Sequence, residues 1–310
     1  MGQGQMINLE TKIGKLVLKN PIILASGTCG YGDAYQRFYS VAKLGAVVTK
    51  GISLKPRSGN PPPRIYETYA GLLNSIGLEN IGVEKFISEK IPKLKKLKAS
   101  VIVNIFGESE QEYVELAKIL NAQEGISALE LNLSCPNVKK GGLEFGRDPE
   151  TVESITREIK ANCALPVWVK LSASRSDPVE LATSAEKAGA DAIVVSNTLK
   201  AMAIELETKK PALGAITGGI SGPGIKPVAL ASVFELVKAV KIPVVGCGGI
   251  FSGRDVLEFL LVGASAVEIG TACLINPRAP IEILNELKEY LKAQKISSIT
   301  DWIGSIRLDD

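Results

Sequence analysis

The chain has 310 residues, of which 45% are hydrophobic and 22% charged, the usual balance for a globular protein with a sizeable core. Its net charge of +3 is too small to indicate nucleic acid binding, which requires a concentrated basic surface. No apolar run reaches the roughly 18 residues of a membrane span, and the N-terminal MGQGQMINLE has no signal-peptide pattern. We therefore expect a cytoplasmic protein that binds neither nucleic acid nor membranes.

The chain contains no histidine, and its five cysteines are scattered without CxxC spacing. The absence of histidine excludes Ser–His–Asp, Cys–His and HExxH chemistry. The dispersed cysteines argue against a disulfide framework, a zinc site or an iron–sulfur cluster within this chain. We therefore expect no metal here, and catalysis by other side chains.

Short apolar runs recur along the chain, and each is followed by a loop and a helix-like stretch. In chain order they cover residues 22–26, 46–50, 101–106, 128–134, 166–171, 191–197, 243–249 and 266–272. The stretches at 108–122 and 177–190 have the amphipathic spacing of helices. Eight strand–helix units of the α/β class predict a TIM barrel, in a single domain over residues 1–310.

Three long segments, 51–80, 134–149 and 198–226, each follow a predicted strand. They predict loop insertions at the C-terminal face of the barrel, where such barrels carry their function. The alternative fold, a doubly wound open sheet, would need a GxGxxG turn or a Walker motif for its usual nucleotide work. The chain has neither.

Polar residues and glycines stand where the predicted strands end. They are Ser26, Lys50, Asn104, Asn132, Lys170 and Asn197, then Gly248-Gly249 and Gly270-Thr271 after the last two strands. In a barrel these positions converge on one mouth. A single such residue is more often a loop stabiliser than a ligand, but six in register are hard to explain that way. Two lysines in one mouth would repel each other unless an anion lay between them.

The glycines after the last two predicted strands indicate what that anion is. Glycine lets backbone N–H groups approach an anion closely, and the loops after strands seven and eight form the usual phosphate site of these barrels. A glycine pair alone is weak evidence because turns use glycine in any case. Its position after strand seven, matched by Gly270-Thr271 after strand eight, favours a phosphorylated cofactor or substrate.

With several specific stretches the chain resembles the dihydroorotate dehydrogenases, flavin enzymes of pyrimidine synthesis. These stretches span nearly the whole chain: ASGTCGYG (25–32), TKGIS (49–53), NSIGLEN (74–80), NLSCPNVKKGGLEFG (132–146), VKLS (169–172), SNT (196–198), GGISGPGIKPVAL (218–230), GCGGI (246–250) and GASAVEIGTA (263–272). The resemblance implies a barrel that holds FMN, with its phosphate at the loops after the last two strands.

The same resemblance implies two sets of contact residues. FMN is expected against Ser26, Lys50, Gly51, Asn104, Asn132, Lys170, Ser196, Gly222, Gly248, Gly249, Gly270 and Thr271. The pyrimidine is expected against Lys50, Asn74, Ser75, Ile76, Gly77, Leu78, Asn132, Asn197 and Thr198. Two residues depart from the family pattern: Cys29 replaces an aromatic residue, and Ser196 replaces an apolar one. It is open whether Ser196 contacts FMN through its side chain or only its backbone.

Cys135, within NLSCPN, is the implied base. In the expected reaction FMN takes a hydride from dihydroorotate, and Cys135 removes a proton from the neighbouring methylene. A free thiol has a pKa of about 8.5, so roughly 3% is thiolate at pH 7 and no histidine is required. Lys170 would stabilise charge on the reduced flavin. Without the motif, a small buried residue would be the better interpretation, and the other four cysteines keep it.

The motifs also favour one type within the family. A membrane-linked type would carry an N-terminal extension and usually a serine as base, so Cys135 indicates another type. NSIGLEN, VKKGGLEFG and GGISGPGIKPVAL resemble class 1B, in which a partner subunit with FAD and a [2Fe–2S] cluster reduces NAD. We expect a heterotetramer of two catalytic and two electron-transfer subunits. The alternatives are a homodimeric, fumarate-reducing type and a flavin-free lyase that forms a Schiff base on Lys50 or Lys170.

Overall fold

A closed barrel of eight parallel strands forms the centre of the molecule. The computed structural model describes residues 7–133, 145–173 and 177–308. In order around the barrel the strands are β3 (Ile22–Leu24), β4 (Ala46–Val48), β7 (Ser100–Ile105), β8 (Ala128–Asn132), β9 (Val167–Leu171), β10 (Ala192–Val195), β15 (Val244–Cys247) and β16 (Ala266–Ile269). Each lies within or overlaps its predicted run, so the TIM barrel prediction is confirmed.

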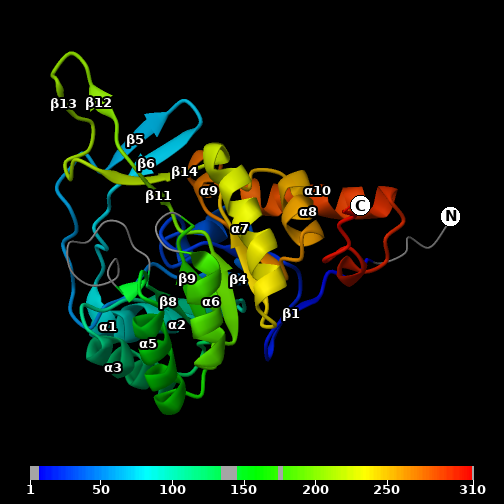
Figure 1. Ribbon diagram of the computed structural model, residues 1–310, viewed down its shortest axis with the longest axis horizontal. Helices are drawn as coiled ribbons and strands as arrows, with labels where there is room; N and C mark the ends of the chain where they lie inside the picture. Colours follow the sequence, from blue (N-terminus) through cyan, green and yellow to red (C-terminus); the bar gives the residue numbers. More distant parts are fainter. Residues whose placement is uncertain (1–6, 134–144, 174–176, 309–310) are drawn as a thin grey trace.

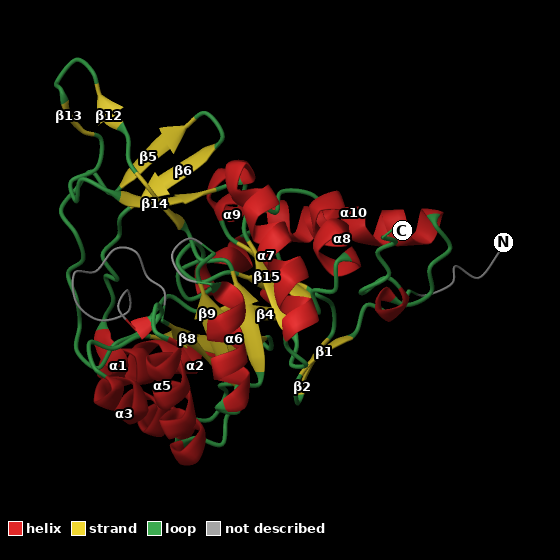
Figure 2. Ribbon diagram, viewed as in Figure 1, coloured by secondary structure: helices red, strands yellow, loops and turns green. Residues whose placement is uncertain are grey.

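Helices surround this barrel on the outside (Figures 1 and 2). They are α1 (Gly82–Lys85), α2 (Ile91–Lys96), α3 (Glu110–Asn121), α5 (Pro149–Asn162), α6 (Pro178–Lys187), α7 (Lys226–Ala239), α8 (Gly253–Leu261), the short α9 (Thr271–Ile275) and α10 (Ala279–Ala293). Side-chain caps determine several starts: Ser109 accepts a hydrogen bond from the Glu112 amide at α3, and Asp177 accepts one from Val179 at α6. The helices predicted at 108–122 and 177–190 are thereby confirmed.

Two apolar layers result from the alternation of side chains along the barrel strands. One layer fills the barrel interior and includes Ile23, Ala128 and Trp168. The other lies between the strands and the helices and includes Leu24 and Leu129. Both faces of each strand are therefore buried, which explains the nearly continuous apolar runs in the sequence.

The two described insertions form a small antiparallel sheet over one end of the barrel, seen at the upper left of Figure 1. Its strand order is β11 (Leu199–Ala201), β14 (Gly218–Ser221), β6 (Gly71–Asn74) and β5 (Ile65–Thr68), and a ribbon of β12 (Ile204–Glu205) and β13 (Lys210–Pro211) extends from it. The insertions follow β4 and β10, so the prediction of inserted loops at the C-terminal face is confirmed for them. Most of the third segment, 134–149, lies outside the described residues.

A hairpin of β1 (Thr11–Ile13) and β2 (Leu16–Leu18) adds to the apolar layer inside the barrel, where Ile13 and Leu18 are fully buried. Because Ile13 and Leu18 pack against that interior layer, the hairpin closes the end of the barrel opposite the inserted sheet. In the part of the chain that the structure describes, no helix is long and apolar enough to cross a membrane.

Candidate active site

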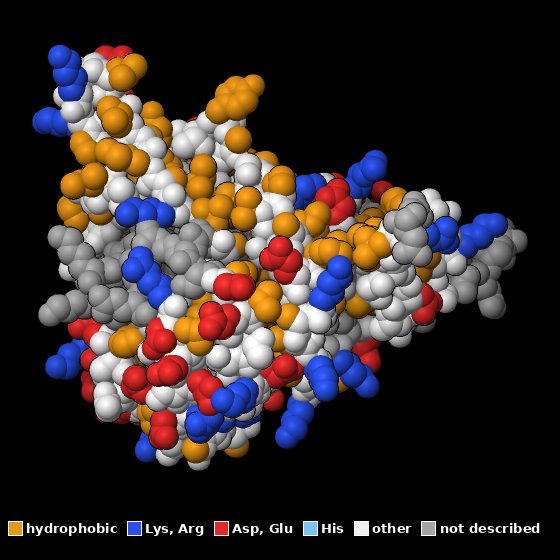
Figure 3. Space-filling model, in the orientation of Figure 1, with side chains coloured by type: hydrophobic (Ala, Val, Ile, Leu, Met, Phe, Trp, Pro, Cys, Tyr) orange, Lys and Arg blue, Asp and Glu red, His pale blue; other side chains and the backbone are white. Residues whose placement is uncertain are grey.

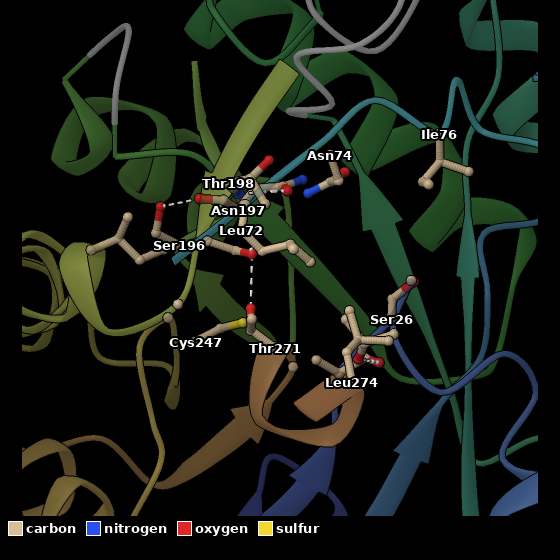
Figure 4. Close-up of a pocket in the computed structure, with 18 of the residues that line it drawn as sticks. Ser26, Leu72, Asn74, Ile76, Ser196, Asn197, Thr198, Cys247, Thr271 and Leu274 are labelled. Atoms are coloured by element: carbon tan, nitrogen blue, oxygen red, sulfur yellow. Dashed lines mark hydrogen bonds between the residues drawn. The ribbon is translucent and has the colours of Figure 1, made fainter. Parts of the chain in front are cut away.

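A cavity opens at the carboxyl ends of the barrel strands, beneath the inserted sheet (Figure 4). It contains about 1430 Å³ of empty space, including its open entrance. Every residue predicted to contact FMN lines it: Ser26, Lys50, Gly51, Asn104, Asn132, Lys170, Ser196, Gly222, Gly248, Gly249, Gly270 and Thr271. Residues from distant parts of the sequence thus meet at one mouth, while their individual roles remain predictions.

The residues predicted to contact the pyrimidine lie in the same cavity, with one exception. Asn74, Ile76, Gly77, Leu78, Asn197 and Thr198 line it. Ser75 does not: its side chain is buried, and its hydroxyl accepts a hydrogen bond from Asn60 Nδ2 at 2.7 Å. In extended chain neighbouring side chains point to opposite sides, so Asn74 and Ile76 face the cavity while Ser75 faces away. The expectation that Ser75 belongs to the site has no support from its position.

Hydrogen bonds at the ends of β8 and β10 orient the amide groups of the cavity. Asn197 Nδ2 donates to Asn132 Oδ1 at 3.2 Å, and Asn197 Oδ1 accepts from the Thr198 amide at 2.8 Å. The Asn132 carbonyl accepts from the Tyr113 hydroxyl at 2.9 Å. The first two contacts orient the asparagine side chains, which can then offer a donor and an acceptor to a planar amide ring, and the third holds the backbone of Asn132.

The Ser196 hydroxyl is engaged within its own loop. It donates to the Asn197 carbonyl at 2.6 Å and accepts from the Ala173 amide at 3.1 Å. Figure 4 shows Ser196 at the side of the cavity next to Asn197. This arrangement favours the backbone, and not the side chain, as the part of Ser196 that is available to a ligand.

Lys170 lies at the floor of the cavity between two buried carboxyl groups. Its Nζ is 2.5 Å from Glu268 Oε2 and 3.6 Å from Glu130 Oε1. Asn104 Nδ2 donates to Glu130 Oε1 at 2.6 Å. Both glutamates are fully buried and Lys170 is 5% exposed. Burial alone would lower the pKa of Lys170, but Glu130 and Glu268 outweigh it and raise the pKa above its ordinary value, so Lys170 is a charged ammonium.

Glu130 and Glu268 are not among the residues predicted from the sequence. They determine the charge balance around Lys170. Two lysines in one mouth would require an anion between them only if both charges were uncompensated, yet the charge of Lys170 is compensated within the protein. Strand alternation could have revealed both residues. Glu130 follows the interior Ala128 by two positions, and Glu268 follows Ala266 in the same way, so both must point into the barrel.

Lys50, unlike Lys170, is a lysine for which an anionic ligand is still expected. It lines the cavity, is half-buried, and within the described residues its ammonium makes no ion pair. Its backbone amide donates to the Gly30 carbonyl at 2.7 Å, which fixes the start of the loop after β4. A cation that faces the cavity without a carboxylate partner among these residues is suited to bind an anionic ligand group.

The glycine loops after β15 and β16 form a backbone cradle. Gly249 has φ +74°, and a Cβ there would lie 2.6 Å from Lys226 Cβ, so only glycine fits. The amides of Gly248 and Gly249 find no acceptor among the described residues. Across the cavity, Thr271 Oγ1 donates to Ser221 Oγ at 2.8 Å. Amides without acceptors, in a close backbone approach that excludes a side chain, fit the phosphate of a bound cofactor.

The cysteines divide differently from the sequence interpretation. Cys29, Cys163 and Cys273 are buried as expected, but Cys247 is only partly buried and lines the cavity beside Lys170. Burial raises the pKa of the Cys247 thiol to about 12, so it remains protonated at neutral pH. Cys135 lies outside the described residues, and its role as base stays a prediction. Among the described residues no group of three or more histidine, cysteine or acidic side chains is arranged to hold a metal ion.

An eight-stranded parallel barrel with a cavity at the carboxyl ends of its strands is the arrangement of a TIM-barrel enzyme. Comparison with known families is more specific: residues 8–291 match the family described as dihydroorotate dehydrogenase. The chain belongs to the dihydroorotate dehydrogenase family.

Several curated relatives are similar over almost their full length. A protein of Caldicellulosiruptor saccharolyticus is 48% identical over 302 residues, which cover 97% of this chain and 100% of that protein. One of Trichlorobacter lovleyi is 49% identical over 298 residues, covering 96% and 98%. Both are named dihydroorotate dehydrogenase B (NAD(+)), catalytic subunit.

A solved structure supports the fold independently. The crystal structure of a DHODH from Eimeria tenella in complex with ferulenol superimposes with a TM-score of 0.79. The match covers 96% of this chain and 88% of that one, at 24% sequence identity. At this identity the likeness concerns the fold alone.

Proposed function

We propose that this chain is the catalytic subunit of an NAD-linked dihydroorotate dehydrogenase of class 1B, which oxidises dihydroorotate to orotate in pyrimidine biosynthesis. It would work as a single FMN-binding barrel domain in the cytoplasm. The observation that carries the proposal is the cavity itself. It combines a cation without a carboxylate partner among the described residues, a set of oriented amides and a glycine cradle, in a chain of this family.

The residues present fit FMN at two places. The backbone of Gly248, Gly249, Gly270 and Thr271 would hold the phosphate, because these groups lie in the loops after the last two barrel strands. The floor of the cavity offers the Lys170 ammonium and amide side chains to the polar edge of the flavin ring system. Asn104 Oδ1 is buried without a partner among the described residues, and so has an acceptor position left for a ligand N–H.

When bound, FMN supplies the hydride acceptor. The chain's own residues bind and orient the substrate. Lys50 pairs with the carboxylate of dihydroorotate, and Asn74, Asn132 and Asn197 hydrogen-bond to the amide groups of its ring. Lys170 places a fixed positive charge where negative charge develops, which stabilises that charge without reorganisation. Cys135 takes the methylene proton, a role that rests on the NLSCPN motif.

The proposal also covers the final electron acceptor, NAD, and the subunit that passes electrons to it. The names of the relatives, which specify NAD and a catalytic subunit, support a second subunit. We infer that this partner carries FAD and a [2Fe–2S] cluster and forms a heterotetramer with two copies of this chain. Exposed apolar side chains gather on the inserted sheet and its ribbon (Figure 3), among them Tyr69, Ile204 and Leu206. A surface of this kind beside the cavity suits the docking of another subunit.

Two alternatives remain to be separated. A homodimeric, fumarate-reducing enzyme would use the same cavity, and the apolar surface would suit a second copy equally well. A flavin-free lyase needs a neutral lysine amine to form a Schiff base. Lys170 is unsuited to that because two carboxyl groups hold it charged, which leaves only Lys50 for such chemistry.

The first test is the absorption spectrum of the purified chain, followed by release of its chromophore and anaerobic addition of dihydroorotate. We expect one non-covalent FMN per chain and loss of the oxidised flavin absorption on addition of the substrate. Recovery of FAD, or of no flavin, would reject the cofactor assignment.

A second test concerns the acceptor. The isolated chain should oxidise dihydroorotate with artificial acceptors but reduce NAD poorly until the partner is added. Equal turnover with NAD and with artificial acceptors would contradict the proposal that NAD reduction requires a second subunit. A preference for fumarate would move the protein to the homodimeric type.

A further inference from the structure

The buried charges at the floor of the cavity do not balance if every group is ionised. Glu130 on β8 and Glu268 on β16 bracket Lys170 on β9, at 3.6 and 2.5 Å. Two carboxylates and one ammonium would leave a net charge of −1 in a site where both glutamates are 0% exposed. Uncompensated charge in such surroundings is strongly unfavourable, and a carboxyl group in this situation usually keeps its proton.

The unpaired carboxyl oxygens of the cluster also indicate that one carboxyl group keeps its proton. Glu130 Oε2 and Glu268 Oε1 are both buried and have no partner among the described residues. The two carboxyl groups are neighbours, because the same Lys170 Nζ lies 3.6 Å from Glu130 Oε1 and 2.5 Å from Glu268 Oε2. One proton shared by the pair would give these buried carboxyl groups a donor and an acceptor in place of two mutually repelling charges. Burial, and then the neighbouring Glu268 carboxylate, raise the pKa of Glu130 well above its ordinary value, which supports a proton in this place.

We propose that Glu130 and Glu268 form a carboxyl pair that shares one proton, and that this pair and Lys170 make a buried, electrically neutral cluster below the cavity. The pair carries one negative charge and the ammonium one positive charge. The other groups that face the cluster are neutral: the Asn104 amide donates to Glu130, and Cys29 and Cys247 are thiols whose pKa values are raised by burial. Glu130 and Glu268 are thus positioning residues that hold the Lys170 ammonium in place.

A shared proton makes an unusual prediction for single substitutions. If Glu268 is replaced by the isosteric Gln, Glu130 no longer has a competing carboxyl group and ionises beside Lys170. The cluster then stays neutral, and the same holds for Glu130→Gln. Only the double variant leaves the Lys170 charge uncompensated. Two independently ionised carboxylates would behave differently, because each single substitution would change the charge of the cluster.

Infrared spectroscopy of the purified full chain measures this proton directly. At pH 7 the wild type should show the carbonyl band of a protonated carboxylic acid, which shifts when the glutamates carry ¹³C. The band should be lost in Glu130→Gln and in Glu268→Gln. It should be retained in Glu235→Gln, a control in which an exposed carboxylate on α7 is replaced. A wild type without the band, or a single variant that keeps it, overturns the proposal.

The wild-type spectrum needs no variant, so the test survives if a substitution prevents folding. It also needs no flavin, so failure of the proposed function would leave the result interpretable. The consequence for a bound flavin rests on the proposed function. The reduction potential of bound FMN should stay close to wild type in each single variant and rise in the double variant, because an uncompensated cation favours the reduced, anionic form. Single variants that shift the potential as far as the double variant would contradict the neutral cluster.

Discussion

Lys50 follows β4 and Lys170 lies near the end of β9, and these two lysines of one cavity have different surroundings. Lys170 is 5% exposed and lies between two carboxyl groups. Lys50 is half-buried, faces the same cavity and makes no ion pair within the described residues. The same residue type thus forms a buried ion pair in one case and a cation that faces the cavity in the other. Neighbouring strands, and not the lysine itself, decide the difference.

The largest effect is expected from a residue that neither lysine can replace. Because Lys170 is held as an ammonium, it cannot accept a proton. Cys135→Ala should therefore slow flavin reduction by dihydroorotate on the order of 10²–10⁴-fold while FMN stays bound. Cys135→Ser should retain slightly more activity, displaced to higher pH, because a hydroxyl is the weaker acid. Anaerobic stopped-flow measurement of flavin absorption checks both. A normal rate in the Ala variant would show that Cys135 is not the base.

Removing the Lys170 charge should chiefly affect stability. Lys170→Met leaves two buried carboxyl groups without their cation, which we expect to lower the free energy of unfolding by about 3–5 kcal/mol. The matched variant Lys50→Met should change it by less than about 1 kcal/mol, because its ammonium has no ion pair to lose among the described residues. Urea denaturation at pH 7 compares the two. Equal losses would show that the lysines do not differ as described.

The pH dependence of stability provides a second test of the buried ion pair at Lys170. The pKa of Glu130 is raised in the folded state by burial and then by Glu268, so folding binds a proton that the unfolded chain has released. Its stabilising contribution is complete below the unfolded carboxyl pKa of about 4.3 and is lost as pH rises through the higher folded value. Lys170→Met should steepen this loss, because the ammonium no longer offsets ionisation. Unfolding curves at several pH values measure it, and a flat profile in the variant would contradict the assignment.

A moderate effect on orotate binding is expected from substitution of Lys50. Lys50→Met should weaken orotate binding on the order of 10²-fold, since a hydrogen bond between charged groups contributes roughly 1.5–3 kcal/mol. Lys50→Arg should recover part of it by keeping the charge. Titration of the flavin spectrum with orotate gives the dissociation constants. If Lys50→Met binds orotate normally, the anion lies elsewhere in the cavity.

The smallest effect is expected at Ser196. Its hydroxyl bonds to Asn197 and Ala173, so Ser196→Ala should cost about 1 kcal/mol of stability. FMN affinity should change by less than about threefold if only the backbone contacts the cofactor. Equilibrium dialysis of FMN tests this. A large loss of affinity would assign the side chain to the cofactor after all.

The sequence alone was sufficient for the barrel and for most of the cavity. Eight apolar runs with helices between them admit few other folds, and their polar ends must converge once the barrel closes. The glycines at 248–249 were informative because backbone can approach closely only where no side chain intervenes, and a Cβ at Gly249 would meet Lys226. These features are local, since each depends on residues close together in the chain.

Contacts between side chains on distant barrel strands could not be predicted from the sequence pattern. Lys170 and Glu268 are 98 residues apart in sequence and meet only because β9 and β16 belong to one barrel. Alternation along each strand shows that both point inward, but not that they form an ion pair. That the Ser75 side chain is buried away from the cavity, and that Cys247 lines it, was likewise decided by packing. The sequence determined which groups reach the mouth, because strand period and chain order are local properties. Tertiary structure determined which charges are compensated, because burial and proximity across a barrel arise only when it closes.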